Sequence, residues 1–194
     1  MVKGEILMDK GNFRGIFIKE EFFKEHSDFK KLLDLGDTAK QSRRSYIFLE
    51  IEYKNNKLFI PLRTNLGDPV RKFGVIGFSV PSKDKPLAGL DYRHILIIND
   101  SKYIEVPSEP RIPKSQRKII DDNYNKIQSE AISYIEGYVK TAIKGREEKE
   151  PKYRESVLHN FHEELGVLAG KKERQEKLKS KKNNISKCSE KDAI

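Results

Sequence analysis

The chain has 194 residues and a net charge of +9, with 39 lysines and arginines against 30 aspartates and glutamates, and this length predicts one compact domain with at most an appendage. The single cysteine, Cys188, excludes an internal disulfide and a thiolate metal cluster. The longest aliphatic run, residues 95–98, is too short to span a bilayer and residues 1–12 lack the apolar stretch of a secretory signal, so we expect a cytoplasmic protein without membrane contact.

The first elements in chain order are a strand and a helix. Residues 13–18 predict a short strand, and residues 20–35 predict a helix because apolar side chains recur at helical spacing up to Gly36. Residues 37–45 are polar and basic, which is typical of a loop. We expect this loop to bring positive charge to an edge of the sheet.

A β-hairpin follows. Residues 46–53 and 57–62 are β-rich, and Asn55-Asn56 between them tolerates the positive φ that a two-residue hairpin turn requires. Pro61 closes the second strand, because it cannot donate a hydrogen bond to a ladder. Three further short strands are expected over residues 73–80, 94–99 and 103–106.

The C-terminal part is predicted to be helical. Apolar residues recur at spacings of three and four between Ile120 and Ala142, which predicts a long amphipathic helix from Pro113 to Gly145. A second helix is expected over residues 156–165. The fold class is therefore α+β: short antiparallel strands curl into a small, strongly curved barrel, with an N-terminal helix and a C-terminal helical pair packed against it.

The positive charge is concentrated at the C-terminal end. Residues 170–194 carry nine basic and four acidic side chains, so +5 of the +9 lies there. The apolar spacing also collapses beyond Gly170, which predicts a single domain over residues 1–169 and a basic tail over residues 170–194 that is either disordered or a frayed extension. The remaining charge favours a polyanionic partner only weakly.

Several enzyme classes and a metal site are disfavoured by the motifs. The sequence lacks a phosphate-binding loop, a dinucleotide fingerprint and a nucleophile elbow, so no cofactor is expected. His159 and His162 lie three residues apart, whereas the zinc-protease motif needs a spacing of four, so we predict a solvated helix face and no bound metal. His94 is a candidate general base because imidazole changes its charge near neutral pH; a structural role is the alternative.

A group of polar side chains surrounds the predicted hairpin. Antiparallel pairing places Arg43 and Arg44, which precede the first strand, at the same end of the sheet as Arg63, Thr64 and Asn65, which follow the second. Guanidinium groups match phosphate oxygens with two-point hydrogen bonds, and the neutral donors can orient a sugar or base. This arrangement predicts a phosphodiester site; the alternative is a surface turn with solvated arginines.

Two segments carry a family resemblance. Phe59-Ile-Pro-Leu-Arg-Thr64 and Gly89-Leu-Asp-Tyr-Arg-His-Ile-Leu-Ile-Ile-Asn-Asp100, followed by a long helix, resemble the endoribonuclease toxins of type III toxin-antitoxin systems, the ToxN, AbiQ and CptN group and above all its TenpN branch. The resemblance covers residues 13–143. It implies a barrel related to the MazF and Kid toxins, metal-free cleavage of RNA with sequence preference, and phage defence by abortive infection.

The resemblance also implies the partners. A small structured antitoxin RNA, made of repeated pseudoknots, is expected to inhibit the toxin in a hetero-oligomeric protein–RNA assembly. Cellular or phage RNA is the expected substrate. Cleavage would use the substrate's own 2′-hydroxyl as nucleophile and leave a 2′,3′-cyclic phosphate, so the protein must align that oxygen and stabilise developing negative charge.

The resemblance assigns roles to individual residues. Pro61-Leu62 matches the family's Pro-Leu step, Thr64 falls where relatives have a catalytic hydroxyl, and Arg43 or Arg44 lies near a basic residue ahead of the preceding strand. Relatives continue with Pro and Lys after the hydroxyl residue, whereas this chain has Asn and Leu. The missing positive charge must then come from one of Arg63, Lys72 or Lys83.

The predicted site has two groups of residues. The expected catalytic residues are Arg44, Arg63, Thr64 and His94. The expected RNA-binding residues are Arg43, Tyr46, Asn65, Lys72, Lys83, Lys85, Arg93 and Lys102.

Three other functions are compatible with parts of the sequence. In a non-catalytic RNA-binding module, the same basic loops would hold RNA, and exposed Tyr46, Tyr92 and Tyr103 would stack on its bases. An enzyme for a small acidic substrate is disfavoured because nothing marks a cofactor pocket. DNA binding by the long helix is weaker still, because its Ile/Tyr stripe predicts packing against a core.

Overall fold

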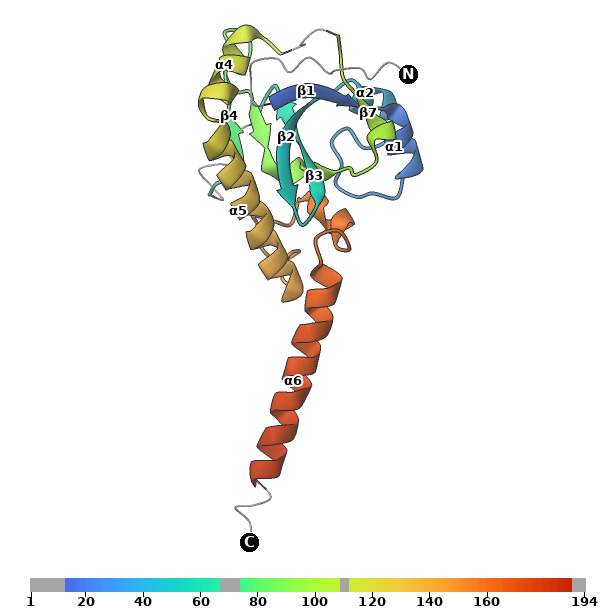
Figure 1. Cartoon of the computed structure of the whole chain (residues 1–194), viewed down its shortest axis with the longest axis vertical. Coiled ribbons are helices and arrows are strands. Elements are labelled where there is room, and N and C mark those ends of the chain that lie inside the picture. Colours follow the sequence, from blue (N-terminus) through green and yellow to red (C-terminus); the bar gives the residue numbers. More distant parts are fainter. Residues whose placement is uncertain (1–12, 67–73, 109–111, 190–194) are drawn as a thin grey trace, which may run out of the picture.

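The computed structural model describes residues 13–66, 74–108 and 112–189 (Figure 1). A seven-stranded sheet has hydrogen-bonded neighbours in the order β4-β5-β3-β2-β1-β7, and β6 pairs with β3. All pairs are antiparallel. The strands are β1 (Phe13–Ile18), β2 (Ser45–Tyr53), β3 (Asn56–Arg63), β4 (Gly77–Ser79), β5 (Gly89–Asp91), β6 (Leu96–Ile97) and β7 (Ile104–Glu105).

Helices flank this sheet. Figure 1 shows α4 and α5 along one side, α1 and α2 beside β1 and β7, and α6 extending away from the body. None of the described helices is long and apolar enough to cross a membrane. The helices are α1 (Glu20–Glu25), α2 (Thr38–Ser42), α4 (Lys114–Asp122), α5 (Tyr124–Ile143) and α6 (Val167–Ser189), with 3-10 helices η1 (Tyr92–His94), η2 (Ser101–Tyr103) and η3 (Val157–Phe161).

The α+β class with an antiparallel sheet is confirmed, but a closed barrel is not. Within the described residues, the path of paired strands ends at β4 on one side and β7 on the other, and no pairing joins these two strands. The core lies between the sheet and the helices. On α5 the expected apolar stripe is buried, with Ile127, Ala131, Ile135, Tyr138 and Ala142 all inaccessible to solvent.

The hairpin is confirmed, with its turn shifted by one residue. Tyr53 pairs with Asn56, so the two turn residues are Lys54 and Asn55, with φ of 53° and 62°. Asn56 was expected in the turn but is buried, and its amide Nδ2 donates to the carbonyl of Glu164 at 2.9 Å. A buried amide must satisfy its donors, and this tertiary contact decides the register.

The helix predicted over residues 20–35 ends ten residues early, at Glu25. The backbone of Lys30 is paired with the Asn160 side chain instead of a helical ladder: its N–H donates to Oδ1 at 3.0 Å, and its carbonyl accepts from Nδ2 at 2.9 Å. Positive φ at Lys31 and Asp34 then excludes a right-handed helix there. Of the apolar-spaced side chains, Phe29 packs against Phe161 of η3, whereas Phe22 and His26 pack against Tyr103 of η2.

Three other predictions need correction. The loop predicted over residues 37–45 contains α2, whose first turn is capped by Asp37, because its side chain accepts from the backbone N–H of Lys40 at 2.8 Å. The long helix is interrupted at Asn123, which separates α4 from α5. The second helix is shorter than predicted and is 3-10 in form, with Ser156 as its N-cap.

The C-terminal segment forms the helix α6 as far as Ser189. Gly170 lies against Ile143, where a Cβ atom would come within 2.5 Å of the isoleucine side chain, so the start of α6 packs on α5. Side chains from residue 172 to residue 180 are exposed. The helix therefore leaves the body of the protein after one or two turns. The boundary between a domain over residues 1–169 and a tail over residues 170–194 stays a prediction.

Removing residues 173–194 is expected to change the free energy of unfolding by less than about 0.5 kcal/mol, because surface positions away from the core rarely contribute more. The deletion retains the contact between Gly170 and Ile143. Thermal unfolding followed by circular dichroism measures the effect. Loss of a cooperative transition would show that the distal part of α6 is structural.

Candidate functional site

A cavity of about 630 Å³ lies where α2, the end of β3 and the start of α4 meet. Its lining contains five cationic side chains and one acid. The cations are Lys40, Arg43, Arg44, Arg63 and Lys85, the acid is Asp37, and the other lining residues are Leu62, Thr64, Ala88, Ile112, Pro113 and Gln116. A volume in this range suits a small-molecule or nucleotide-sized ligand, and the charge favours an anion.

Asp34 positions two of the cations. Its carboxylate accepts from the guanidinium of Arg44, and its Oδ1 lies 2.8 Å from Nζ of Lys40. Partial burial acts to raise the pKa of Asp34, but the hydrogen bonds from Lys40 and Arg44 outweigh it, and the pKa lies below its ordinary value. Arg44 is thus held in place, and its buried Nε has no hydrogen-bond partner in the described part of the chain.

Asp91 positions Arg63. This carboxylate is fully buried at the end of β5, and its Oδ2 accepts from Nη1 of Arg63 at 2.8 Å. Arg93 binds the same carboxylate through two hydrogen bonds, of 2.9 and 2.8 Å, and Nδ1 of His94 lies 3.0 Å from Oδ2.

The pKa of Asp91 shows that its cationic neighbours outweigh its burial. Burial acts to raise this pKa, but the contacts of His94 and Arg93 hold it well below the usual range of a carboxyl group. Asp91 is therefore charged at neutral pH. It fixes the Arg63 side chain, which is 30% exposed, toward the cavity.

Of the predicted catalytic residues, three line one cavity. Arg44, Arg63 and Thr64 come together there, as antiparallel pairing of the hairpin strands predicts, and Thr64 is exposed. His94 is not among the lining residues, because it lies on η1 behind Asp91 with 12% of its side chain exposed. Its role in proton transfer stays a prediction.

The predicted RNA-binding residues are dispersed. Arg43 and Lys85 line the cavity, whereas Lys83 and Asn65 are exposed outside its lining. Arg93 is committed to Asp91. Lys102 lies elsewhere, 4.4 Å above the ring of Tyr103 and 3.6 Å from Glu25 and Asp100. Lys72 and the side chain of Tyr46 lie outside the described residues.

The expectation that Tyr92 and Tyr103 are exposed for base stacking is wrong. Tyr92 is fully buried, and its hydroxyl donates to Glu130 at 3.1 Å; burial raises its pKa. Tyr103 is 9% exposed and its hydroxyl donates to Glu25 at 2.5 Å. Both rings pack into the core, so neither can stack on an RNA base.

Sequence reasoning missed the residues that hold the arginines and shape the cavity. Asp34 and Asp91 have no fixed spacing from the arginines they bind, and Gln116, which is buried and donates to the carbonyl of Val80, lies on another element. One signal was available. An acid placed two and three residues before Arg93 and His94 is typical of a local ion-pair cluster.

Chemically, the lining of the cavity suits a negatively charged ligand. Guanidinium and ammonium groups donate hydrogen bonds but stay protonated at neutral pH, so the arginines act electrostatically. Asp37 is the carboxylate in the lining, and it is engaged as the cap of α2. The arrangement suits the orientation of a phosphodiester and stabilisation of added charge on its oxygens.

Three solved structures are similar to this chain. A protein of a bacterial antiviral system that a processed non-coding RNA regulates is 16% identical over 69% of this chain and 88% of its own, with a TM-score of 0.52. A bacterial type III toxin, selectively inhibited by a non-coding RNA pseudoknot, is 13% identical over 63% and 77%, with a TM-score of 0.49. AbiQ, a lactococcal anti-phage endoribonuclease of a type III toxin-antitoxin system, is 17% identical over 74% and 90%, with a TM-score of 0.49.

The likeness is one of fold. No protein-family model matches the chain, and no curated protein is significantly similar to it. The structure of the RNA-regulated antiviral protein nevertheless matches over most of both chains. This match shows a fold in common with an RNA-regulated antiviral protein.

Proposed function

We propose that the protein is a metal-independent, sequence-preferring endoribonuclease toxin of a type III toxin-antitoxin system, inhibited by a repeated pseudoknot RNA. The observation that carries this proposal is the cavity in which Arg44, Arg63 and Thr64 converge with three further exposed cations. The fold shared with an RNA-regulated antiviral protein supports it. The same cavity would bind either substrate RNA or antitoxin RNA, so bound antitoxin RNA would block access of the substrate.

The proposed reaction uses the substrate's 2′-hydroxyl. The O2′–P bond forms as the P–O5′ bond breaks, the 2′-hydroxyl proton passes to a base, and the departing O5′ takes up a proton. The products are a 2′,3′-cyclic phosphate and a 5′-hydroxyl. The protein needs to align O2′ with the phosphorus and to stabilise the extra charge on the phosphate oxygens.

Roles follow from the geometry of the cavity. Arg63, held by Asp91, and Arg44, held by Asp34, would donate to the non-bridging oxygens. Thr64 is exposed at the end of β3 and would orient the ribose or the phosphate through its hydroxyl. His94 is our candidate for proton transfer, and it would have to act through a rearrangement or a water, because it does not line the cavity.

Incubation of the purified protein with mixed RNA and excess chelator tests the proposal. We expect fragments that end in a 2′,3′-cyclic phosphate, detected by their resistance to ligation at the 3′ end until the cyclic phosphate is opened and the resulting phosphate is removed to leave a 3′-hydroxyl. A matched reaction with Thr64→Ala controls for a contaminating ribonuclease. RNA binding without cleavage would contradict the proposal and favour a non-catalytic RNA-binding module.

A further inference from the structure

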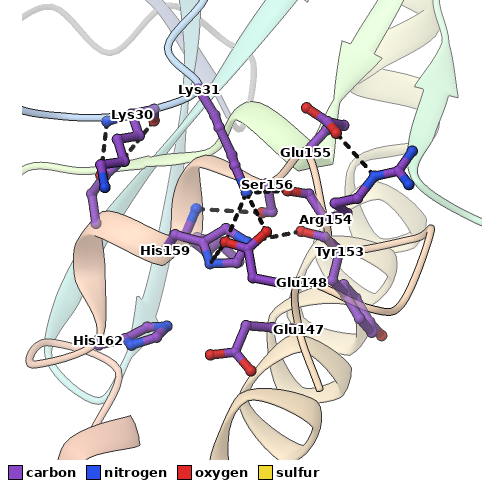
Figure 2. A network of polar contacts seen from close by, with 12 residues as sticks. Lys30, Lys31, Glu147, Glu148, Tyr153, Arg154, Glu155, Ser156, His159 and His162 are labelled. Atoms are coloured by element: carbon purple, nitrogen blue, oxygen red, sulfur yellow. Dashed lines mark hydrogen bonds and ion pairs between the residues drawn. The ribbon is translucent and has the colours of Figure 1, made fainter. Parts of the chain in front are cut away.

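A second cluster of polar side chains lies outside the cavity, between the segment that follows α5 and η3 (Figure 2). Glu147, His159 and His162 each offer one ligand atom, and these three atoms lie within 4.8 Å of one another. The cluster shares no residue with the cationic cavity. Figure 2 shows the His162 ring and the Glu147 carboxylate facing each other.

Glu147 is buried with one oxygen unsatisfied. The residue is only 7% exposed, and its Oε1 lies 3.2 Å from Nζ of Lys171. Its Oε2 is inaccessible to solvent and has no hydrogen-bond partner among the described residues. A buried carboxylate oxygen without a donor is costly, so such an atom in a native protein indicates an additional proton or cation.

Each histidine has one nitrogen engaged with a neighbour. Nε2 of His159 lies 3.2 Å from the carbonyl of Tyr153, and Nε2 of His162 lies 2.7 Å from the hydroxyl of Tyr138. If these nitrogens carry the ring protons, Nδ1 of each ring presents a lone pair. Such outer contacts are typical of metal-binding histidines, since they fix the tautomer and orient the ring.

The Nδ1 atom of His159 also lies 3.5 Å from Oε1 of Glu148. Because both ring nitrogens face acceptors, a neutral ring can donate to only one of them, and the second contact needs either a protonated ring or a bound cation. Burial lowers the pKa of both His159 and His162.

We propose that Glu147, His159 and His162 bind one divalent transition-metal ion, with Zn²⁺ as the ion that fits this ligand set. Two imidazoles and one carboxylate form a common three-ligand zinc set, with water as the fourth ligand. Bonds of about 2.0–2.1 Å place tetrahedral ligand atoms about 3.3 Å apart, so the side chains must close by up to about 1.5 Å around the ion.

The bound ion would keep one coordination position for water and would link two segments of the chain. It would tie the segment after α5 to η3, next to the start of α6, and it would satisfy Oε2 of Glu147. Two lysines already neutralise the nearby carboxylates, because Lys171 pairs with Glu147 and Lys31 pairs with Glu148. Lys171 is the competitor of the ion, and its side chain, 33% exposed, can move into solvent.

The test uses the full-length protein, stripped with chelator and dialysed, and titrated with ZnCl₂ in a calorimeter. We expect one Zn²⁺ per chain and a higher melting temperature in its presence. Glu147→Gln should weaken binding by on the order of 100-fold or more, whereas Glu163→Gln, an exposed neighbour of His162, should bind as the wild type does. Lys171→Gln should bind more tightly, because the competing ammonium is gone.

Absence of binding to the wild type would overturn the proposal, as would equal Zn²⁺ affinity in Glu147→Gln and Glu163→Gln. If Glu147→Gln does not fold, Co²⁺ bound to the wild type reports the site through its visible absorption, and an octahedral spectrum would also overturn the proposal. RNA cleavage in the presence of chelator is measured in a separate experiment. The zinc site and the proposed ribonuclease function can therefore fail independently.

Discussion

Replacement of Thr64 by alanine is expected to lower the rate of RNA cleavage about 100-fold with an almost unchanged melting temperature. Loss of one donor directed at developing charge commonly costs about 2.7 kcal/mol in the transition state. Thr64 is exposed at the mouth of the cavity, and exposed substitutions usually change stability by less than about 0.5 kcal/mol. Single-turnover cleavage and thermal melting of one preparation measure both quantities.

Thr64→Ser is the matched control, because it keeps the hydroxyl and should retain most of the activity. Arg63→Ala should lose cleavage by a similar factor, while Asp91 keeps its contacts with Arg93 and His94. RNA affinity separates chemistry from binding, since a catalytic residue can be lost with RNA still held. Unchanged cleavage in both alanine variants would remove these residues from the site and leave Arg43 and Arg44 as candidates.

The parts of the fold that the sequence predicted are local ones. The hairpin of β2 and β3 depends on a two-residue turn and on alternation, both of which lie within a few residues. The early end of α1 depends on a distant contact, because the backbone of Lys30 pairs with Asn160, a residue 130 positions away. The stripe on α5 was also recognisable, whereas the break at Asn123 had no clear breaker in the sequence.

The candidate site likewise contains residues that strand pairing could predict and residues that only tertiary packing brings there. Arg44, Arg63 and Thr64 could be placed together because strand pairing brings both ends of the hairpin to one edge. The carboxylates that pair with these arginines could not be predicted, because Asp34 and Asp91 reach Arg44 and Arg63 through tertiary packing. The same limit applied to His159 on η3 and to His162 directly after it. Spacing alone could not indicate their neighbour Glu147, because this residue reaches them from the segment after α5.

Replacement of Asp91 by alanine is expected to have the largest effect on stability. The carboxylate is fully buried and holds Arg63, Arg93 and His94 together. Removal of one partner from a buried ion pair costs about 3–5 kcal/mol, because the remaining charges are left uncompensated. Chemical denaturation at neutral pH measures the loss. Cleavage should also fall, because Arg63 is no longer held toward the cavity.

The pH dependence of stability tests whether the charge of Asp91 is the cause. The folded-state pKa of Asp91 is depressed, so its contribution is complete above the ordinary carboxyl pKa of about 3.9 and is lost as the pH falls further. Wild-type stability should therefore decline below about pH 4 more steeply than that of Asp91→Asn, which keeps the shape without the charge. Parallel curves for the two proteins would mean that Asp91 acts through packing alone, and Arg63 would then need another explanation for its orientation.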